Sequence, residues 1–252
     1  PSSAASDVYK RQALGLISTI VSSNFAHLHV HTEYSMLDGA ARVADLVKEV
    51  AAQEMPAIAI TDHGNLFGAF DFYKQAKKAG VKPIIGLEAY VAPETRFDKR
   101  RVQWAEGGED DVSGGGAYTH MTLLAENNQG LANLFRLASL SSLEGFYYKP
   151  RIDRELLSKY GKGLIGTTGC PGGEIQTRLR MGSFKEALKA ASEMQDILGK
   201  GNFFVELMDH GLDIETRVQS DLLKLAKELD LPLLATNDLH YTYKEDSSAH
   251  EV

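Results

Sequence analysis

The chain has 252 residues, 43% of them hydrophobic, which suffices to bury one sizeable core. Its formal net charge of −7 argues against a protein that coats nucleic acid through general electrostatics, because such binding needs a basic surface; a local basic patch remains compatible with it. The single cysteine, Cys170, excludes an internal disulfide framework and fits a reducing compartment, so we expect a cytoplasmic protein.

Residues 1–23 do not enter the fold prediction. The segment "PSSAASDVYKRQ" resembles a sequencing-adapter or vector remnant more than natural protein, with a frayed native extension as the alternative. The next apolar run is interrupted by Ser18 and Thr19 and is shorter than the roughly 18 to 20 residues that span a bilayer. We therefore predict no membrane segment and place the domain at residues 24–252.

From residue 25 onward, apolar runs of strand length alternate with segments of helical period. Strands are expected near residues 25–31, 56–64, 82–92, 119–127, 162–170, 202–211 and 231–240. Helices are expected at residues 41–53, 65–80, 131–143, 183–199 and 215–229. Residues 93–117 lack periodicity and are predicted to form a loop or insertion rich in Gly and Asp.

Two of the expected helices carry specific local patterns. Residues 41–53 place four apolar side chains on one face at helical spacing: Val43, Leu46, Val47 and Val50. Ser183 is a plausible N-cap for residues 183–199, with Glu186 three residues on, the spacing of a capping box. About seven strands with helices between most of them, and no internal repeat, predict an α/β fold of the β/α barrel type.

Polar residues end most of the apolar strands, and in β/α barrels the loops after the strands build the active site. These strand-end residues are His29, His31, Asp62, His63, Glu88, Cys170, Glu206, Asp209, His210, Asp238 and His240.

His29 and His31 are one residue apart, so on a strand both imidazoles project from the same face and can chelate one ion. His27 falls on that face as well. Asp238 and His240 repeat this spacing near the end of the chain. A single strand-end histidine is usually structural, but two such pairs favour a shared centre for a divalent metal such as zinc, manganese or iron.

Nucleophilic catalysis is a weaker alternative. Cys170 precedes a Pro-Gly-Gly turn and a possible helix, where a thiolate could be activated, although a lone cysteine is commonly inert and buried. The sequence contains no G-x-S-x-G elbow, no GxGxxG after a strand and no Walker sequence, which disfavours hydrolase triads, dinucleotides and nucleoside triphosphates.

Several motifs together resemble the polymerase and histidinol phosphatase (PHP) domain family, and within it the PHP domain of bacterial replicative DNA polymerase III alpha subunits of the actinobacterial type. They are "HLHVHTEYSMLDGA", "AITDHGNLFGAFDFYKQAKKAGVKPIIGLEAYV", "YTHMTLLAENNQGLANLFRL", "TTGCPGGEIQTRLR", "FFVELMDHG" and "LATNDLHY". The resemblance runs from about residue 24 to the end. That family continues into polymerase regions absent from this sequence.

The resemblance implies a distorted seven-stranded (β/α)7 barrel that holds up to three divalent metal ions. The nine ligands it implies are His29, His31, Asp38, His63, Glu88, His120, Cys170, Asp238 and His240. His120 opens its predicted strand instead of ending it, so either that strand runs opposite to the others or the ligand comes from a loop. We expect His27 to orient a ligand by a hydrogen bond. His210 is expected either to support a ligand in the same way or, by slight preference, to form a hydrogen bond within the core.

The family grouping assigns His29, His31 and Asp238 to one ion, His120 and Cys170 to a second, and Asp38, His63 and His240 to a third. Glu88 is the candidate bridge between two of the ions. With Asp38 and His63, it forms the expected catalytic set. The expected reaction is phosphodiester hydrolysis by metal-activated water, in the form of 3′–5′ exonuclease proofreading.

The expected partners are DNA at a single-stranded primer 3′ end, the polymerase domains of the full-length chain, and the sliding clamp and other replisome subunits, with no membrane. Aromatic and basic residues could stack a base and hold a phosphate, with surface solvation as the default. They are Tyr147, Tyr148, Lys149, Arg151, Arg178, Arg180, Arg96, Lys99, Arg100 and Arg101. The two rival functions are a small-molecule phosphomonoesterase and a non-catalytic module that braces the polymerase.

Overall fold

The computed structural model describes residues 25–102 and 114–250. The expected N-terminal extension, residues 1–23, and the centre of the expected insertion, residues 103–113, lie outside these ranges. The strands are β1 (Ala57–Ile60), β2 (Lys82–Val91), β3 (Thr119–Ala125), β4 (Arg151–Ile152), β5 (Leu164–Thr167), β6 (Phe203–Leu207) and β7 (Leu233–Ala235). The α-helices are α2 (Val43–Ala52), α3 (Ala69–Lys78), α4 (Asn128–Leu143), α5 (Arg154–Tyr160), α6 (Glu174–Arg180), α7 (Phe184–Leu198), α8 (Asp213–Leu229) and α9 (Ser247–His250).

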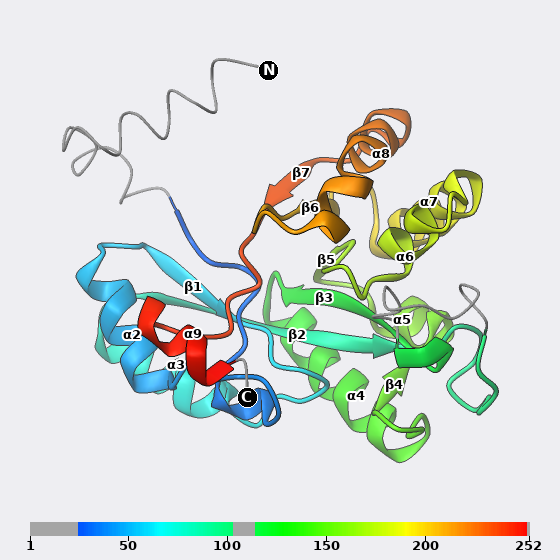
Figure 1. Cartoon of the computed structure of the whole chain (residues 1–252). Coiled ribbons are helices and arrows are strands. Elements are labelled where there is room, and N and C mark those ends of the chain that lie inside the picture. The colour runs from blue at the N-terminus through cyan, green and yellow to red at the C-terminus, as the bar shows by residue number, and fades with distance from the viewer. Residues whose placement is uncertain (1–24, 103–113, 251–252) are drawn as a thin grey trace.

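The strands form one curled sheet in the order β1-β2-β3-β5-β6-β7, with β4 added beside β2 (Figure 1). All pairs are parallel except those of β3, which runs antiparallel to both β2 and β5. The beginning of β3 therefore lies at the carboxyl end of β2, where Tyr90 pairs with His120. This resolves the two alternatives for His120 in favour of a reversed strand.

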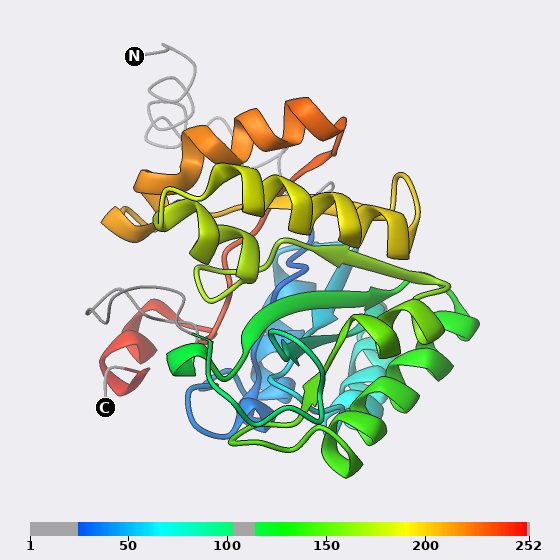
Figure 2. The same cartoon turned by 90° about the vertical axis from the view of Figure 1, so that its right-hand side faces the viewer.

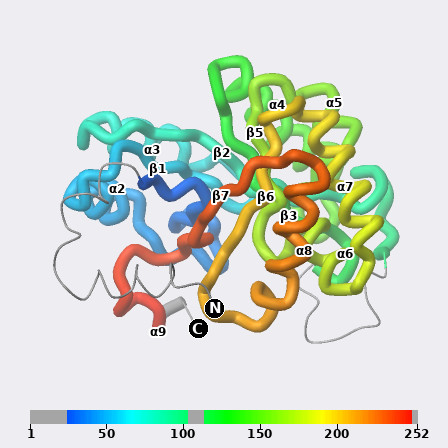
Figure 3. The backbone as a smooth tube through the Cα atoms, turned by 90° about the horizontal axis from the view of Figure 1, so that it is seen from above, coloured from blue at the N-terminus to red at the C-terminus, as the bar shows by residue number. Residues whose placement is uncertain are grey.

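The sheet curls until its two ends meet through the first described segment of the chain. Val30 bridges Leu239 in the parallel sense, and His31 N donates to Leu239 O at 2.7 Å. On the other side Thr61 N, just after β1, donates to Val30 O at 2.9 Å. Figure 3 shows the segment after β7 beside the N-terminal segment, as expected for a distorted barrel.

The expected opening strand is wrong in one respect: residues 25–31 form no regular strand, and among them Val30 alone makes a bridge. The reason lies in its partner. Asp238 has a φ of 43°, in the left-handed region, so the chain at Leu239 cannot continue as an extended ladder.

Helices cover the outside of the sheet in three groups: α2 with α3, α4 with α5, and α6 with α7 and α8 (Figures 1 and 2). The four predicted apolar residues of α2 are buried and belong to a core cluster that also holds Ile58 and Phe72. A second, larger cluster of buried apolar side chains includes Leu123, Leu157 and Phe203 and joins the sheet to the helices that pack on it. The amphipathic period of each helix thus turns its apolar face to the sheet.

Local hydrogen bonds set several helix ends, not always as predicted. Ser183 occupies the N-cap position of α7, but its side chain makes no capping hydrogen bond, so the expected capping box is wrong. Asn127 and Asp153 instead cap α4 and α5 by accepting backbone N–H groups. Helix α3 starts at Ala69, later than predicted, because the Asn65 side chain bonds neighbouring backbone and holds that stretch as a turn.

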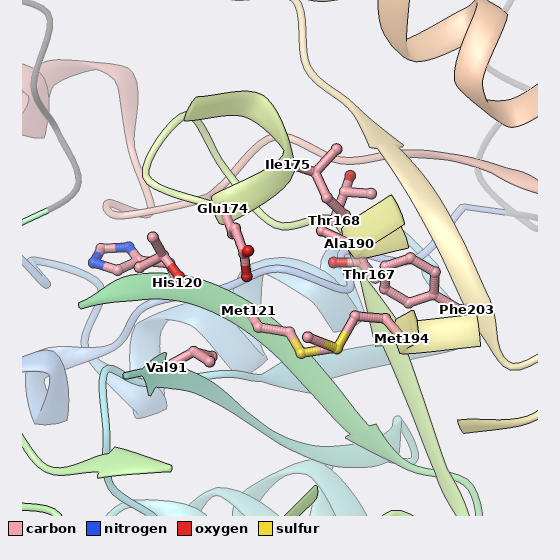
Figure 4. Close-up of a pocket in the computed structure, with 11 residues that line it drawn as sticks. Val91, His120, Met121, Thr167, Thr168, Glu174, Ile175, Ala190, Met194 and Phe203 are labelled. Carbon is pink, nitrogen blue, oxygen red and sulfur yellow. The ribbon is translucent and has the colours of Figure 1, made fainter. Parts of the chain in front are cut away.

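The layer between the sheet and helices α6 and α7 is closely packed. Figure 4 shows a pocket between β3, β5 and α6 in which the side chains of Met121 and Met194 meet below His120 and Glu174. Its volume is about 20 Å³, room for a single water molecule. No helix in the two described ranges is both long and apolar enough to cross a bilayer.

Candidate metal centre

Glu88 lies at the middle of the predicted ligand set, with 1% of its side chain exposed. Its Oε1 is 3.5 Å from His29 Nε2 and 3.2 Å from His120 Nδ1. Its Oε2 is 3.4 Å from His31 Nε2 and 2.5 Å from His63 Nδ1. One carboxylate thus contacts four imidazoles that come from three different parts of the chain.

Asp238 supplies a second carboxylate to the same cluster. Its Oδ1 lies 3.3 Å from His29 Nε2, 3.2 Å from His31 Nε2 and 3.6 Å from His240 Nδ1. The left-handed backbone at Asp238, which Gly, Asn and Asp adopt more readily than other residues, turns this side chain into the barrel mouth. Backbone outliers of this kind occur preferentially at functional sites.

Asp38 stands at the open rim of the cluster, with 41% of its side chain exposed. His63 Nε2 donates to its Oδ2 at 3.1 Å, and His240 Nε2 lies 4.0 Å away. The loop that carries Asp38 can approach only because residue 39 is glycine, since a Cβ there would lie 1.8 Å from Thr32 O.

Cys170 completes the set on the side of β5. Its Sγ is 3.3 Å from Glu88 Oε1 and 3.5 Å from His120 Nδ1. Burial, together with the negative charges of Glu88 and Asp238, raises the pKa of the thiol well above its ordinary value. The weaker alternative of an activated nucleophile therefore loses support, because a protonated thiol is a poor nucleophile.

The nine predicted ligands thus meet at the mouth of the barrel, and their chemistry fits divalent metal ions. Several buried polar atoms of the set lack a hydrogen bond, which is costly unless something else satisfies them. These atoms are His29 Nε2, His31 Nε2, Asp38 Oδ1, His63 Nδ1, Glu88 Oε2 and Asp238 Oδ1. Imidazole nitrogen and carboxylate oxygen are ligands of zinc, manganese and iron.

Within residues 25–102 and 114–250, three sets of residues place their ligand atoms within 4.8 Å of one another. They are His29–His31–Glu88, His63–Glu88–His120 and His31–His63–His240. Glu88 belongs to two of the three, as a bridging carboxylate would. His31 and His63 are shared as well, so the division of ligands among the ions stays a prediction.

The electrostatics of the cluster are those of tightly coupled charges. Burial lowers the pKa of His31 to about 4, so this imidazole is neutral and able to bind a metal. Burial would also lower the pKa of His63, but the charge of Glu88 and the bond to Asp38 outweigh it and raise that pKa to about 10. A bound cation would compete with the proton at His63.

Two further histidines were assigned supporting roles. Among the described residues no ligand bonds the His27 side chain, whose Nδ1 is buried without a partner and whose ring packs edge-on against Phe25 at 4.8 Å. The ligand-orienting role expected for it is therefore not supported. His210 forms hydrogen bonds to Glu215 (2.6 Å) and to the carbonyl of Asn237 (2.8 Å), as favoured, but is 39% exposed and outside the core.

The side chains that hydrogen-bond the predicted ligands His29 and His31 were not predicted to do so. Glu206 Oε1 lies 2.8 Å from His29 Nδ1, and Ser35 Oγ lies 2.9 Å from His31 Nδ1 and donates to Asp62 at 2.8 Å. Glu206 and Asp62 were among the polar strand-end residues. Full burial of a charge, the feature that separates them from surface carboxylates, is not visible in the sequence.

The predicted DNA-binding cations are not equivalent. Arg151 is fully buried and donates to the carbonyls of Gly145, Ala117 and Arg96, so its assignment to substrate binding is wrong. Arg96 is 7% exposed and pairs with carboxylates including Asp153. Both guanidinium groups satisfy buried polar groups instead of facing solvent.

The other basic residues lie nearer the surface, several already engaged. Arg178 donates to Glu174, and Arg180 to the carbonyl of Pro171. The Lys149 ammonium lies 5.5 Å from the centroid of the Tyr90 ring.

Around the remaining cations, Arg100 pairs with Asp98 and the Arg101 guanidinium lies 5.0 Å from the Tyr148 ring. Lys99 is exposed. None of these three approaches the ligands through a contact among the described residues, so DNA binding by them stays a prediction.

A groove with a volume of about 680 Å³ opens beside two of the ligands. Its lining includes Pro171, Met208, Leu212, Asp238, His240 and Tyr241. Apolar walls next to metal-binding groups are typical of small-ligand sites, which span about 300 to 1,000 Å³.

Comparison with known proteins places this geometry in a family. The chain is 59% identical over 235 residues to the DNA polymerase III subunit alpha of Saccharopolyspora erythraea, covering 90% of this chain and 20% of the relative. It is 55% identical over 233 residues to that of Mycobacterium tuberculosis strain H37Rv, with 91% and 20% covered. The chain spans about a fifth of the length of these curated relatives.

A solved two-domain protein from Bacteroides vulgatus, which contains a predicted PHP-like metal-dependent phosphoesterase, aligns at 15% identity with a TM-score of 0.45. That alignment covers 88% of this chain and 55% of the other. The sequence model of the PHP domain matches residues 27–210. The expected resemblance is confirmed: the chain belongs to the PHP domain family.

Proposed function

We propose that this domain is a metal-dependent phosphoesterase that removes nucleotides from the 3′ end of single-stranded DNA, as a proofreading 3′–5′ exonuclease. The observation that carries the proposal is the convergence of unpartnered buried ligand atoms around Glu88. Divalent cations held there would supply Lewis-acid polarisation of phosphate oxygens and activation of a water molecule.

The residues around the centre suit this chemistry. Glu88 holds the middle of the set in a fixed, buried position. Asp38 and His63 form a hydrogen-bonded pair at the rim, where the pKa of Asp38 is lowered because its bonds and contacts with histidines outweigh burial. We assign both side chains to the catalytic set as ligands that would hold an ion at the open side, where a bound cation would displace the proton of His63.

The surroundings offer places for a nucleic-acid substrate. The groove beside Asp238 and His240 is large enough for one terminal nucleotide. Lys149 lies over Tyr90, whose ring stacks on His63 at 5.8 Å, so its cation stands near the rim of the cluster. We assign Lys149 to binding a phosphate of the DNA backbone. Arg178 and Arg180 are assigned to phosphates of the DNA strand farther from the cluster.

The wider context is also proposed. The relatives are alpha subunits of a DNA polymerase, five times as long as this chain. We infer that the domain acts on the primer strand of an attached polymerase, with the sliding clamp and other replisome subunits bound through the rest of that protein.

The test is degradation of a 5′-labelled single-stranded oligonucleotide by the 252-residue chain with added manganese or zinc. Asp38→Asn and a chelator are the two controls. Stepwise shortening from the 3′ end, lost in both controls, is the expected result.

Two other outcomes would redirect the assignment. Preference for a small phosphate monoester over the oligonucleotide would favour a phosphomonoesterase. A folded chain that binds metal yet cleaves neither substrate would favour a structural brace, because metal ligation can stabilise a fold without turnover.

A further inference from the structure

The two histidines of the HxH pair present the same ring nitrogen to the cluster. His29 and His31 both direct Nε2 toward Glu88 and Asp238, while each Nδ1 faces the protein interior. Both Nδ1 atoms have a hydrogen-bond partner, and both Nε2 atoms are buried without one. This division is expected for a metal-binding imidazole whose far side is anchored by the protein.

The anchors of the two rings differ in charge. His31 Nδ1 meets the hydroxyl of Ser35, whose hydrogen is directed to Asp62, so this oxygen is an acceptor. His29 Nδ1 meets the carboxylate of Glu206 directly, at 2.8 Å. Only His29 therefore has a formally charged acceptor on its own ring nitrogen.

The carboxylate of Glu206 is fixed in place by hydrogen bonds from its neighbours. Its side chain is fully buried, and Thr167 and Thr236 both donate to its carboxylate, the latter at 2.5 Å to Oε1. Its backbone N–H donates to Thr168 Oγ1 at 2.9 Å. A buried carboxylate with two hydroxyl donors and one imidazole donor has a fixed position and direction.

We propose that Glu206 is a positioning residue that keeps the proton of His29 on Nδ1 and thereby sets the affinity of the ion that His29 and His31 share. The inference rests on the proposed metal centre. Because the other two ligand sets do not include His29, the effect should fall on one ion and not on all. Removal of such a partner typically weakens metal binding about 10 to 100-fold.

The experiment titrates the metal-free 252-residue chain with zinc or manganese against a competing chelating dye and resolves the equivalents bound. Glu206→Gln keeps the volume and a neutral acceptor, and Glu206→Met removes the acceptor. We expect one equivalent to weaken about 10-fold in the first and about 100-fold in the second, with the others unchanged.

Glu215→Gln is the matched control. Glu215 is also a buried glutamate that bonds a histidine Nδ1, in His210, but the Nε2 of that ring is occupied by Asn237 O. We expect its metal affinities to equal those of the wild type.

Each outcome bears on the proposal separately. Unchanged affinity of every ion in both Glu206→Gln and a folded Glu206→Met would overturn it. Equal weakening of every ion would also overturn it, because that would indicate a general structural role. If Glu206→Met does not fold, Glu206→Gln still decides. If the wild type binds no metal, the result would instead contradict the proposed function.

Discussion

Glu88 Oε1 and His120 Nδ1 lie 3.2 Å apart although β2 and β3, which carry these residues, run in opposite directions. The antiparallel register pairs Tyr90 with His120, so the start of β3 coincides with the end of β2. A reversed strand can therefore deliver a ligand from its first residues to a site that parallel strands reach with their last residues.

Glu88→Gln tests the central position of this carboxylate. We expect the variant to lose bound metal and at least about 100-fold in phosphodiesterase rate, since even supporting groups of metal sites cost up to that factor. Metal content after dialysis and oligonucleotide cleavage measure the two effects.

Glu174→Gln serves as the control for that variant. Glu174 is 8% exposed and pairs with Arg154 and Arg178, but it contacts no predicted ligand among the described residues. We expect its metal content to match the wild type. Equal metal content in Glu88→Gln would contradict the central role.

Arg151→Met should destabilise the fold. Its guanidinium is fully buried and donates hydrogen bonds to four backbone carbonyls. Because methionine leaves these carbonyls without a donor, we expect the free energy of unfolding to fall by about 3 to 5 kcal/mol. Urea denaturation of metal-free protein measures this quantity.

Lys149→Met is the matched control two residues away. Because Lys149 is partly exposed and lies over the Tyr90 ring, we expect less than about 0.5 kcal/mol of destabilisation but weaker DNA binding. A stable Arg151→Met protein with selectively weakened DNA binding would restore Arg151 as a substrate residue.

Asp238 separates a backbone effect from a charge effect. Asn tolerates the left-handed φ of 43°, whereas Ala does not, so in metal-free protein Asp238→Ala should be about 1 to 2 kcal/mol less stable than Asp238→Asn. Both variants should lose metal at the His29–His31 ion. Equal unfolding free energies for the two would argue that this conformation is not strained.

His210 should add a pH-dependent contribution to stability. Burial lowers its pKa, but the bond to Glu215 and the carbonyl of Asn237 outweigh this, so the folded-state pKa is raised above 6.5. Its stabilising contribution is then complete below about pH 6.5 and is lost as the pH rises through the folded-state value.

The measurement is urea denaturation of wild type and His210→Gln, both with chelator, over the range of roughly pH 5.5 to 9. The free energies of unfolding of the two proteins should differ most near pH 6 and converge at higher pH. The difference should be modest because His210 is 39% exposed. A difference that grows with rising pH would contradict the assigned direction.

Much of the fold was predictable because it depends on local periodicity. The buried face of α2, the positions of all strands except the two-residue β4, and the alternation of helices with strands follow from the spacing of apolar residues. The first segment was mispredicted as a regular strand, and the capping box at Ser183 does not form. Both depend on neighbours or backbone angles that residue type alone does not specify.

The sequence by itself determined which chemistry is present: pairs such as His29–His31 and Asp238–His240 carry their ligand types and spacing within three residues. Tertiary structure alone decided that Lys149 lies near the rim while Arg151 is buried. The physical reason is that a buried guanidinium needs several carbonyl acceptors. Those for Arg151 come from stretches up to 55 residues away, which only the folded chain brings together.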